Sequence, residues 1–112
     1  MVRATQRSTW ANQALLRKLI RLTAERSTDE PHPAPTRGYL RVEWIEMALS
    51  PLQGRIDESS LERLTSGLAL CVGIEALLVL RDIRGLAVVE AEEVSVWVAR
   101  ALLKATMDEV GT

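Results

Sequence analysis

Glu75 is the residue whose type and setting in this sequence most favour a chemical role. If its segment is helical, Glu75 lies one turn from Cys71 and Val79, within an apolar stripe. An ionised carboxylate in apolar surroundings is costly unless it has a partner. Two interpretations follow: a polar anchor in an otherwise apolar ligand pocket, or a structural ion pair. The candidate cationic partners are Arg41, Arg81 and Arg100.

Four further residues are candidate walls of an effector pocket beside Glu75. They are Trp44, Met47, Cys71 and Trp97. Apolar walls with few polar groups among them are typical of small-molecule sites, and a buried indole N–H favours a hydrogen-bonding partner. The expected effector is therefore small and largely apolar. The alternative, that these residues belong to an ordinary core, remains open.

No pattern in the sequence predicts catalysis. There is no nucleophile beside a general base, no glycine-rich phosphate loop and no paired His or Cys ligands. His32, the single histidine, lies between prolines and has no neighbouring ligands with which to hold a metal ion. We therefore expect no enzyme, no cofactor and no metal site.

Composition and charge are those of a globular protein. Of the 112 residues, 47% are hydrophobic and 26% are charged, and the net charge of −1 gives no global reason to expect a nucleic-acid or membrane partner. The single cysteine cannot form an internal disulfide, and residues 1–10 lack the apolar core of a signal peptide. The apolar run 68–80 is interrupted by Glu75 and is too short to cross a bilayer of about 30 Å. We expect a cytoplasmic protein without a membrane span.

A basic surface is predicted near the start of the chain. Arg17, Lys18 and Arg21 share one face of the first predicted helix, and Arg3 and Arg7 precede it. A charge run of this kind is usually a solvated face, so nucleic-acid binding through this helix is a minor alternative. Binding that persists at high salt would be needed to support it, because non-specific phosphate contacts weaken steeply with salt.

Apolar periodicity predicts an all-α fold, a bundle of about four to five helices in one domain over 1–112. The expected helices span 10–25, 39–49, 57–84 and 88–109, with a short helical restart at 50–53 and a stop at Gly85. The alternating prolines 31, 33 and 35 predict a flexible, extended loop over 26–37.

The last two predicted helices carry apolar residues on more than one side. A surface helix of a monomer needs one apolar stripe about 100° wide, and a short chain has few other helices to cover a second. Burying a Leu or Val side chain contributes roughly 1.5–3 kcal/mol, so we expect a homodimer in which these helices pair with a second copy as a four-helix bundle. The predicted interface comprises Leu70, Ile74, Leu77, Val89, Val96, Leu103 and Met107. Alternatively, the loop and the first two helices cover both sides.

Three segments share a family pattern. They are GYLRVEWIEMALSPLQGRID at 38–57, LTSGLALCVGIEALLVLRDIRGL at 64–86 and EAEEVSVWVARALLKA at 90–105. The second and third resemble the penultimate and final helices of TetR-type (tetracycline-repressor-like) transcriptional regulators, and the first is similar to the preceding segment in one branch. The resemblance covers roughly 15–107 and is made largely of Leu, Ala and Val. The order of the segments and the string Ile74-Glu75-Ala76…Arg81-Asp82…Gly85-Leu86 strengthen it.

That resemblance implies an all-α ligand-sensing domain that homodimerises through its last two helices. In the family, an effector enters a pocket between helices and alters the spacing of two DNA-binding heads. This sequence departs from the family pattern in three places. No helix-turn-helix precedes Trp10, so contact with DNA would depend on an absent N-terminal domain. Ala87-Val88-Val89 replaces the polar cap before the last helix, and the proline-rich loop occupies 26–37.

The sequence therefore predicts a ligand-sensing, homodimerising domain of TetR type that lacks its own DNA-binding head. The alternative is a purely structural helical dimerisation or protein-interaction module without a small-molecule site. A cavity beside Glu75 favours the ligand-sensing domain, whereas a filled core with Glu75 paired internally favours the structural module.

Overall fold

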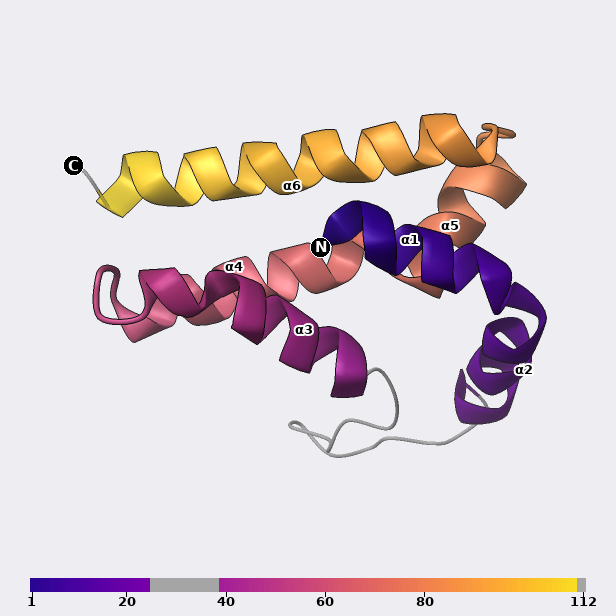
Figure 1. Ribbon diagram of the computed structural model, residues 1–112, viewed down its shortest axis with the longest axis horizontal. Helices are drawn as coiled ribbons and strands as arrows, with labels where there is room; N and C mark the ends of the chain where they lie inside the picture. Colours follow the sequence, from indigo (N-terminus) through magenta and orange to yellow (C-terminus); the bar gives the residue numbers. More distant parts are fainter. Residues whose placement is uncertain (25–38, 111–112) are drawn as a thin grey trace.

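The computed structural model describes residues 1–24 and 39–110, and every regular element within these ranges is a helix (Figure 1). The predicted all-α class is confirmed. The loop predicted over 26–37, which includes His32, lies outside the described residues.

The start of the chain differs from the prediction of one helix over 10–25. The structure has two helices there, α1 (Val2–Ala11) and α2 (Gln13–Ala24), which separate at Asn12. The buried residues of α1 are polar, so the helix has no strong apolar stripe for a sequence pattern to detect. These buried residues are Thr5, Gln6 and Thr9.

The helix α3 and the turn that follows it confirm the prediction. α3 spans Tyr39–Leu49, and the short 3-10 helix η1 (Ser50–Leu52) is the expected restart. The chain then turns at Gly54, whose φ of 79° favours glycine. The Asp57 carboxylate caps α4 (Glu58–Cys71) by accepting the N–H of Ser60 at 3.0 Å.

The predicted continuous helix over 57–84 is broken in the structure. α4 ends at Cys71, and the chain resumes as the short helix α5 (Ile74–Leu78), which continues into the π-helical segment η2 (Val79–Ile83). Between α4 and α5, Val72 is extended, and Gly73 has φ 92° and ψ −169°. We call these two residues the Val72–Gly73 break. It bends the path of the chain by 44°, and Gly85 with φ 67° ends η2 as predicted.

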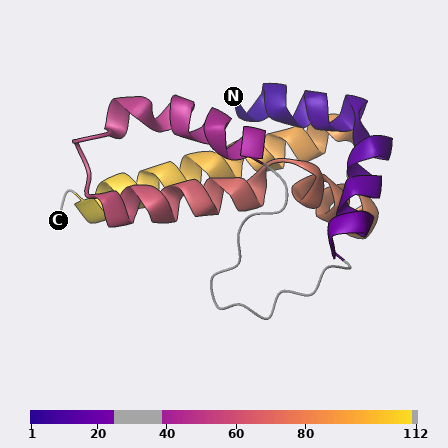
Figure 2. The ribbon, with the colours of Figure 1, turned by 90° about the horizontal axis from the view of Figure 1, so that it is seen from below.

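The helix α6 (Val88–Val110) follows the predicted bounds to within one residue and runs antiparallel beside α4 (Figure 1). α1 packs on α6 and α5, whereas α3 packs on α4. Seen from the edge, α1 and α3 form one layer over a second layer of α4 and α6 (Figure 2). The remaining face of the α4–α6 layer is covered by neither α1 nor α3.

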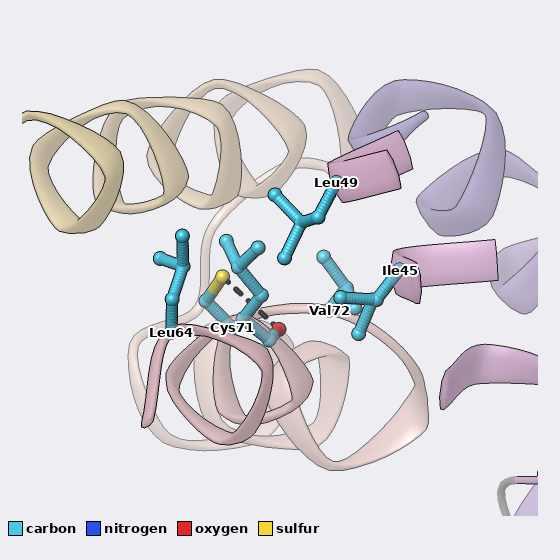
Figure 3. Packing of buried hydrophobic residues seen from close by; sticks show 6 residues of the cluster. Ile45, Leu49, Leu64, Cys71 and Val72 are labelled. Atoms are coloured by element: carbon cyan, nitrogen blue, oxygen red, sulfur yellow. Dashed lines mark hydrogen bonds between the residues drawn. The ribbon is translucent and has the colours of Figure 1, made fainter. Parts of the chain in front are cut away.

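Two clusters of buried apolar residues hold the layers together. The first joins α3 to α4 and the Val72–Gly73 break, with α6 at its edge (Figure 3). Its buried members are Ile45, Leu49, Leu64, Leu68, Cys71 and Val72. The second joins α5 to α6 and to the packed sides of α1 and α2, and its buried members are Ile74, Leu77 and Ala91.

Within the described residues, no single helix is long and apolar enough to cross a membrane. α4 taken together with α5 and η2 reaches that length and composition, but the pair is bent at the Val72–Gly73 break.

Candidate functional site

A cavity of about 440 Å³ lies between α4, the α5–η2 segment and α6. Its walls are apolar or small, apart from the side chains of Glu75 and Ser95. The lining residues are Gly67, Leu70, Cys71, Glu75, Ala76, Val79, Leu80, Val94, Ser95, Val98 and Leu102. Its size and lining are typical of sites for small organic molecules. We refer to it as the α4–α6 cavity.

The α4–α6 cavity meets α6 at Val94, Ser95, Val98 and Leu102. Val94 and Val98 line it, whereas Val96 borders a separate, smaller hollow beside Val2 at the start of α1. Two residues along an α-helix correspond to a rotation of about 200°, so these side chains point to nearly opposite sides. Val94 and Val98 therefore point away from that hollow, whereas Ser95, which also lines the cavity, is hydrogen-bonded to Gln6 of α1.

Gly67, which lines the cavity, allows α4 to approach α6 closely. A Cβ atom at this position would lie 3.2 Å from Cδ1 of Leu102. That distance is tighter than ordinary van der Waals contact, so the Leu102 side chain would have to shift by a few tenths of an ångström to make room for an alanine here. At the far end of the two helices, Arg63 forms an ion pair with Glu109.

Glu75 is both paired and part of the cavity wall. Its Oε2 accepts a hydrogen bond of 2.7 Å from Nη2 of Arg41, one of the three partners considered from sequence. The carboxylate is partly exposed, so solvent screens this pair. The ion pair predicted for Glu75 is therefore present. The cavity beside Glu75, which the ligand-binding interpretation requires, is also present.

Arg41 reaches from α3 across the Val72–Gly73 break. Its Nη1 donates to the carbonyl of Ala69 in the last turn of α4, at 3.3 Å, while Nη2 holds Glu75 in the first turn of α5. The guanidinium occupies the space where a side chain at position 73 would begin, since a Cβ there would lie 2.5 Å from Cζ of Arg41.

Gln6 of α1 holds the same Val72–Gly73 break from the other side. The sequence alone did not predict this role for Gln6. Gln6 is 2% exposed, and its Oε1 accepts the Gly73 N–H at 2.8 Å. Its Nε2 donates to Oγ of Ser95 at 2.9 Å. A glutamine in a polar, basic segment predicts a solvated position, so only the tertiary arrangement identifies this contact.

Cys71 lines the cavity, as predicted, but its thiol is poorly suited to act as a nucleophile. The residue is buried, and its Sγ donates to the carbonyl of Leu68 at 3.3 Å (Figure 3). Burial raises the pKa of the Cys71 thiol above its usual value, which lowers the thiolate fraction at neutral pH. Its position suits a wall of a binding site.

The other predicted wall residues do not line the cavity. Trp44 and Met47 lie on α3, in the other layer, and Met47 is 71% exposed. Trp97 lies on α6 but is 70% exposed and is not among the lining residues. The structure therefore corrects the prediction that these three residues line the cavity beside Glu75, and Met47 and Trp97 are too exposed to be ordinary core residues.

The residues predicted for the dimer interface do not form one surface. Ile74 and Leu77 are buried within the protomer, against α1 and α2, so their assignment to the interface is wrong. Leu70 is 80% exposed beside the cavity. Val89, Leu103 and Met107 are exposed and Val96 is half-buried, and the helical repeat places these four on the α1 side of α6.

Much of the predicted basic surface takes part in ion pairs. Arg3 and Arg7 both contact Glu92, at 3.0 and 3.3 Å, and Arg17 contacts Asp82 at 2.9 Å. The hydrogen bond from Arg3, with a further contribution from Arg7, holds the pKa of Glu92 below its usual value. These pairs tie α1 to α6 and α2 to η2, which leaves less basic surface for phosphate contacts.

The residues that the structure describes contain no group of three or more His, Cys, Asp or Glu side chains placed to hold a metal ion.

Comparisons of the chain with protein-family models, with curated proteins and with solved structures found no match.

Proposed function

We propose that the chain is a ligand-sensing and homodimerising domain of the TetR regulator type, and that it binds a small, largely apolar molecule in the α4–α6 cavity. The observation that carries the ligand-binding part is the cavity itself, about 440 Å³ with nearly uniform apolar walls beside Glu75. The regulator type rests on the resemblance of the segments over 38–105. The antiparallel α4 and α6 are compatible with it.

The composition of the cavity wall favours an apolar ligand. Burying apolar surface contributes roughly 25 cal/mol per Å², so a molecule of about ten carbon atoms gains substantially by leaving water. Only Glu75 and Ser95 supply polar side-chain atoms to the wall, and both already form hydrogen bonds within the protein. A ligand that carries several charged groups would lose hydration there without replacement partners.

The exposed face of the α4–α6 layer supports the homodimer. Leu70, which lines the cavity, is 80% exposed, and Ile83 of η2 and Trp97 of α6 are 76% and 70% exposed. Where large exposed apolar side chains lie together in one patch, they commonly mark a protein interface. A second copy packed on this face would cover these side chains and close the cavity, so the site would be completed by dimerisation.

A structural module without a ligand is the second candidate function. The observation that favours it is the internal pair of Glu75 with Arg41, because a carboxylate that already has a partner needs no ligand. In this case, side chains of the second copy would fill the cavity.

A neutral, polarity-sensitive dye separates the two functions. Nile red is expected to bind saturably to the wild-type protein, with a blue shift and one site per chain. Val94→Trp fills the cavity and is expected to weaken binding by roughly tenfold or more, which corresponds to about 1.4 kcal/mol or more. Val96→Trp, on the opposite side of α6, is the matched control and is expected to bind as the wild type does.

The outcomes are distinct. A dimer that binds no dye at any concentration below aggregation would support the structural module and exclude the ligand-sensing function. Equal weakening by both tryptophan variants would place the dye elsewhere on the protein and would also contradict the proposal.

A further inference from the structure

The Val72–Gly73 break is held by side chains from two other helices. On the α1 side, the buried Gln6 accepts the Gly73 N–H at 2.8 Å. On the α3 side, Arg41 contacts the Ala69 carbonyl before the break and Glu75 after it. The bend between α4 and α5 therefore depends on contacts made outside these two helices.

The segment from α4 to η2 could also form one straight, continuous helix. The apolar pattern over 57–84 predicts one continuous helix, and the structure interrupts it only at Val72 and Gly73. The backbone of Gly73, at φ 92° and ψ −169°, lies in a region that essentially only glycine occupies. Apart from this glycine, nothing in the local sequence favours the bent conformation over a helical one. Gln6 and Arg41 supply contacts that do.

Both contacts reach the wall of the α4–α6 cavity. Gln6 also donates to Ser95, and Arg41 holds Glu75; Ser95 and Glu75 are the two polar residues of the wall. Cys71 and Ala76, which flank the break, line the cavity as well. A change in the bend would therefore move Cys71, Glu75 and Ala76 relative to Ser95 on α6.

We propose that Gln6 and Arg41 are positioning residues of the ligand site: they hold the bend that shapes the α4–α6 cavity, and they couple its occupancy to α1 and α3. This inference rests on the proposed ligand-binding function. A ligand that fits the bent form stabilises it, and by reciprocity the two side chains strengthen binding. The ligand need not touch either residue.

Amide exchange of Gly73 tests the coupling in the wild-type protein. Its N–H is released when the break opens, so saturation with Nile red is expected to slow its exchange. At a free dye concentration of ten times Kd, the slowing is about elevenfold if the open form does not bind. The N–H of Asn12, between α1 and α2, is the control and is expected to change little, because its carbonyl partners lie within α1.

Two variants test the reverse effect, that of Gln6 and Arg41 on ligand binding. Gln6→Met and Arg41→Met keep the bulk of each side chain and remove its polar contacts. Each is expected to raise the Kd for Nile red by about two- to thirtyfold, the usual range for a residue that acts through another. Gln53→Met and Arg55→Met, at exposed positions, are the matched controls and are expected to bind as the wild type does.

The failure of this inference is distinguishable from the failure of the proposed function. If Nile red binds and Val94→Trp abolishes binding, but Gly73 exchange is unaffected, the coupling is wrong and the ligand site stands. If Nile red does not bind to the wild-type protein, the proposed ligand-binding function is itself contradicted. Variants that unfold do not decide the matter, because the exchange experiment uses the wild-type protein.

Discussion

The Nε2 atom of Gln6 lies 2.9 Å from Oγ of Ser95, and this buried hydrogen bond joins the first helix of the chain to the last. The two residues are 89 positions apart in the sequence. Ser95 is 1% exposed and Gln6 is 2% exposed, so both partners are largely shielded from bulk solvent. A polar contact of this kind specifies how α1 docks on α6 more strictly than apolar packing alone would.

Removing the Ser95 hydroxyl is expected to destabilise the fold. Ser95→Ala leaves the buried Gln6 amide without its acceptor, at a cost of about 1–3 kcal/mol, and the midpoint of urea unfolding should fall accordingly. Ser66→Ala, at an exposed position of α4, gains the same helix propensity and is the matched control. Equal midpoints for the two variants would show that the Gln6–Ser95 bond contributes nothing.

Alanine at position 73 is expected to be more costly than alanine at position 54. Both glycines have positive φ, so each substitution introduces backbone strain of about 1–3 kcal/mol. At Gly54, no atom lies within 4 Å of the new Cβ, whereas at Gly73 the guanidinium of Arg41 must move and give up its contacts. We expect the difference in unfolding free energy to be at least about 1 kcal/mol. Equal losses would contradict the close packing of Arg41 on the break.

The pairing of Glu92 predicts a pH dependence of stability. Because Arg3 and Arg7 lower the pKa of Glu92 in the folded state, its stabilising contribution is complete above the unfolded-state pKa of about 4.3. The contribution is lost as pH falls through the lower folded-state pKa. Glu92→Gln should therefore be less stable than the wild type at pH 7, and the gap should close in acid. Thermal unfolding from pH 7 to pH 3 measures it.

The exposed Glu62 of α4 is the control position for that pH experiment. Glu62→Gln is expected to follow the wild-type pH profile. If the gap between Glu92→Gln and the wild type stayed constant down to pH 3, the ion pairs with Arg3 and Arg7 would not be its source.

Charge at the open face of the α4–α6 layer is expected to prevent self-association. Leu70→Glu and Trp97→Glu each place a carboxylate in the proposed dimer interface, and burying it there unpaired would cost several kcal/mol. Sedimentation equilibrium should show the wild type as a dimer and both variants as monomers. Met47→Glu, at an equally exposed position of α3, should remain dimeric. A monomeric wild type would overturn the homodimer.

The Cys71 thiol is expected to report cavity occupancy. Burial and the raised pKa predict that iodoacetamide modifies the folded protein at least about tenfold more slowly than the urea-unfolded chain. Because Cys71 is the only cysteine and lines the cavity, Nile red should slow the reaction of the folded protein further. Unchanged modification at saturating dye would show that the dye binds elsewhere.

Local signals in the sequence were sufficient for several helix ends and for the all-α class. The bounds of α3, the restart at η1, the stop at Gly85 and the span of α6 follow from capping residues, proline, glycine and a 3.6-residue apolar period. The sequence also predicts that Glu75 has a cationic partner, because any carboxylate in apolar surroundings needs one. Arg41 is the one of three candidates that the structure places in contact with it.

The tertiary structure alone decided which polar residues are buried and which apolar residues are exposed. Gln6 is buried because Gly73 and Ser95 supply its partners, whereas Trp97 is exposed because α1 and α3 both pack on the other side of the layer. The Val72–Gly73 break has no local signal beyond a glycine, since its bend depends on side chains 67 and 32 residues earlier in the chain. A 3.6-residue apolar period predicts that one face of a helix is buried, but it does not say against which element. The hydrophobic free energy of burial is about the same against any apolar neighbour. The neighbour is therefore determined only when the helices pack.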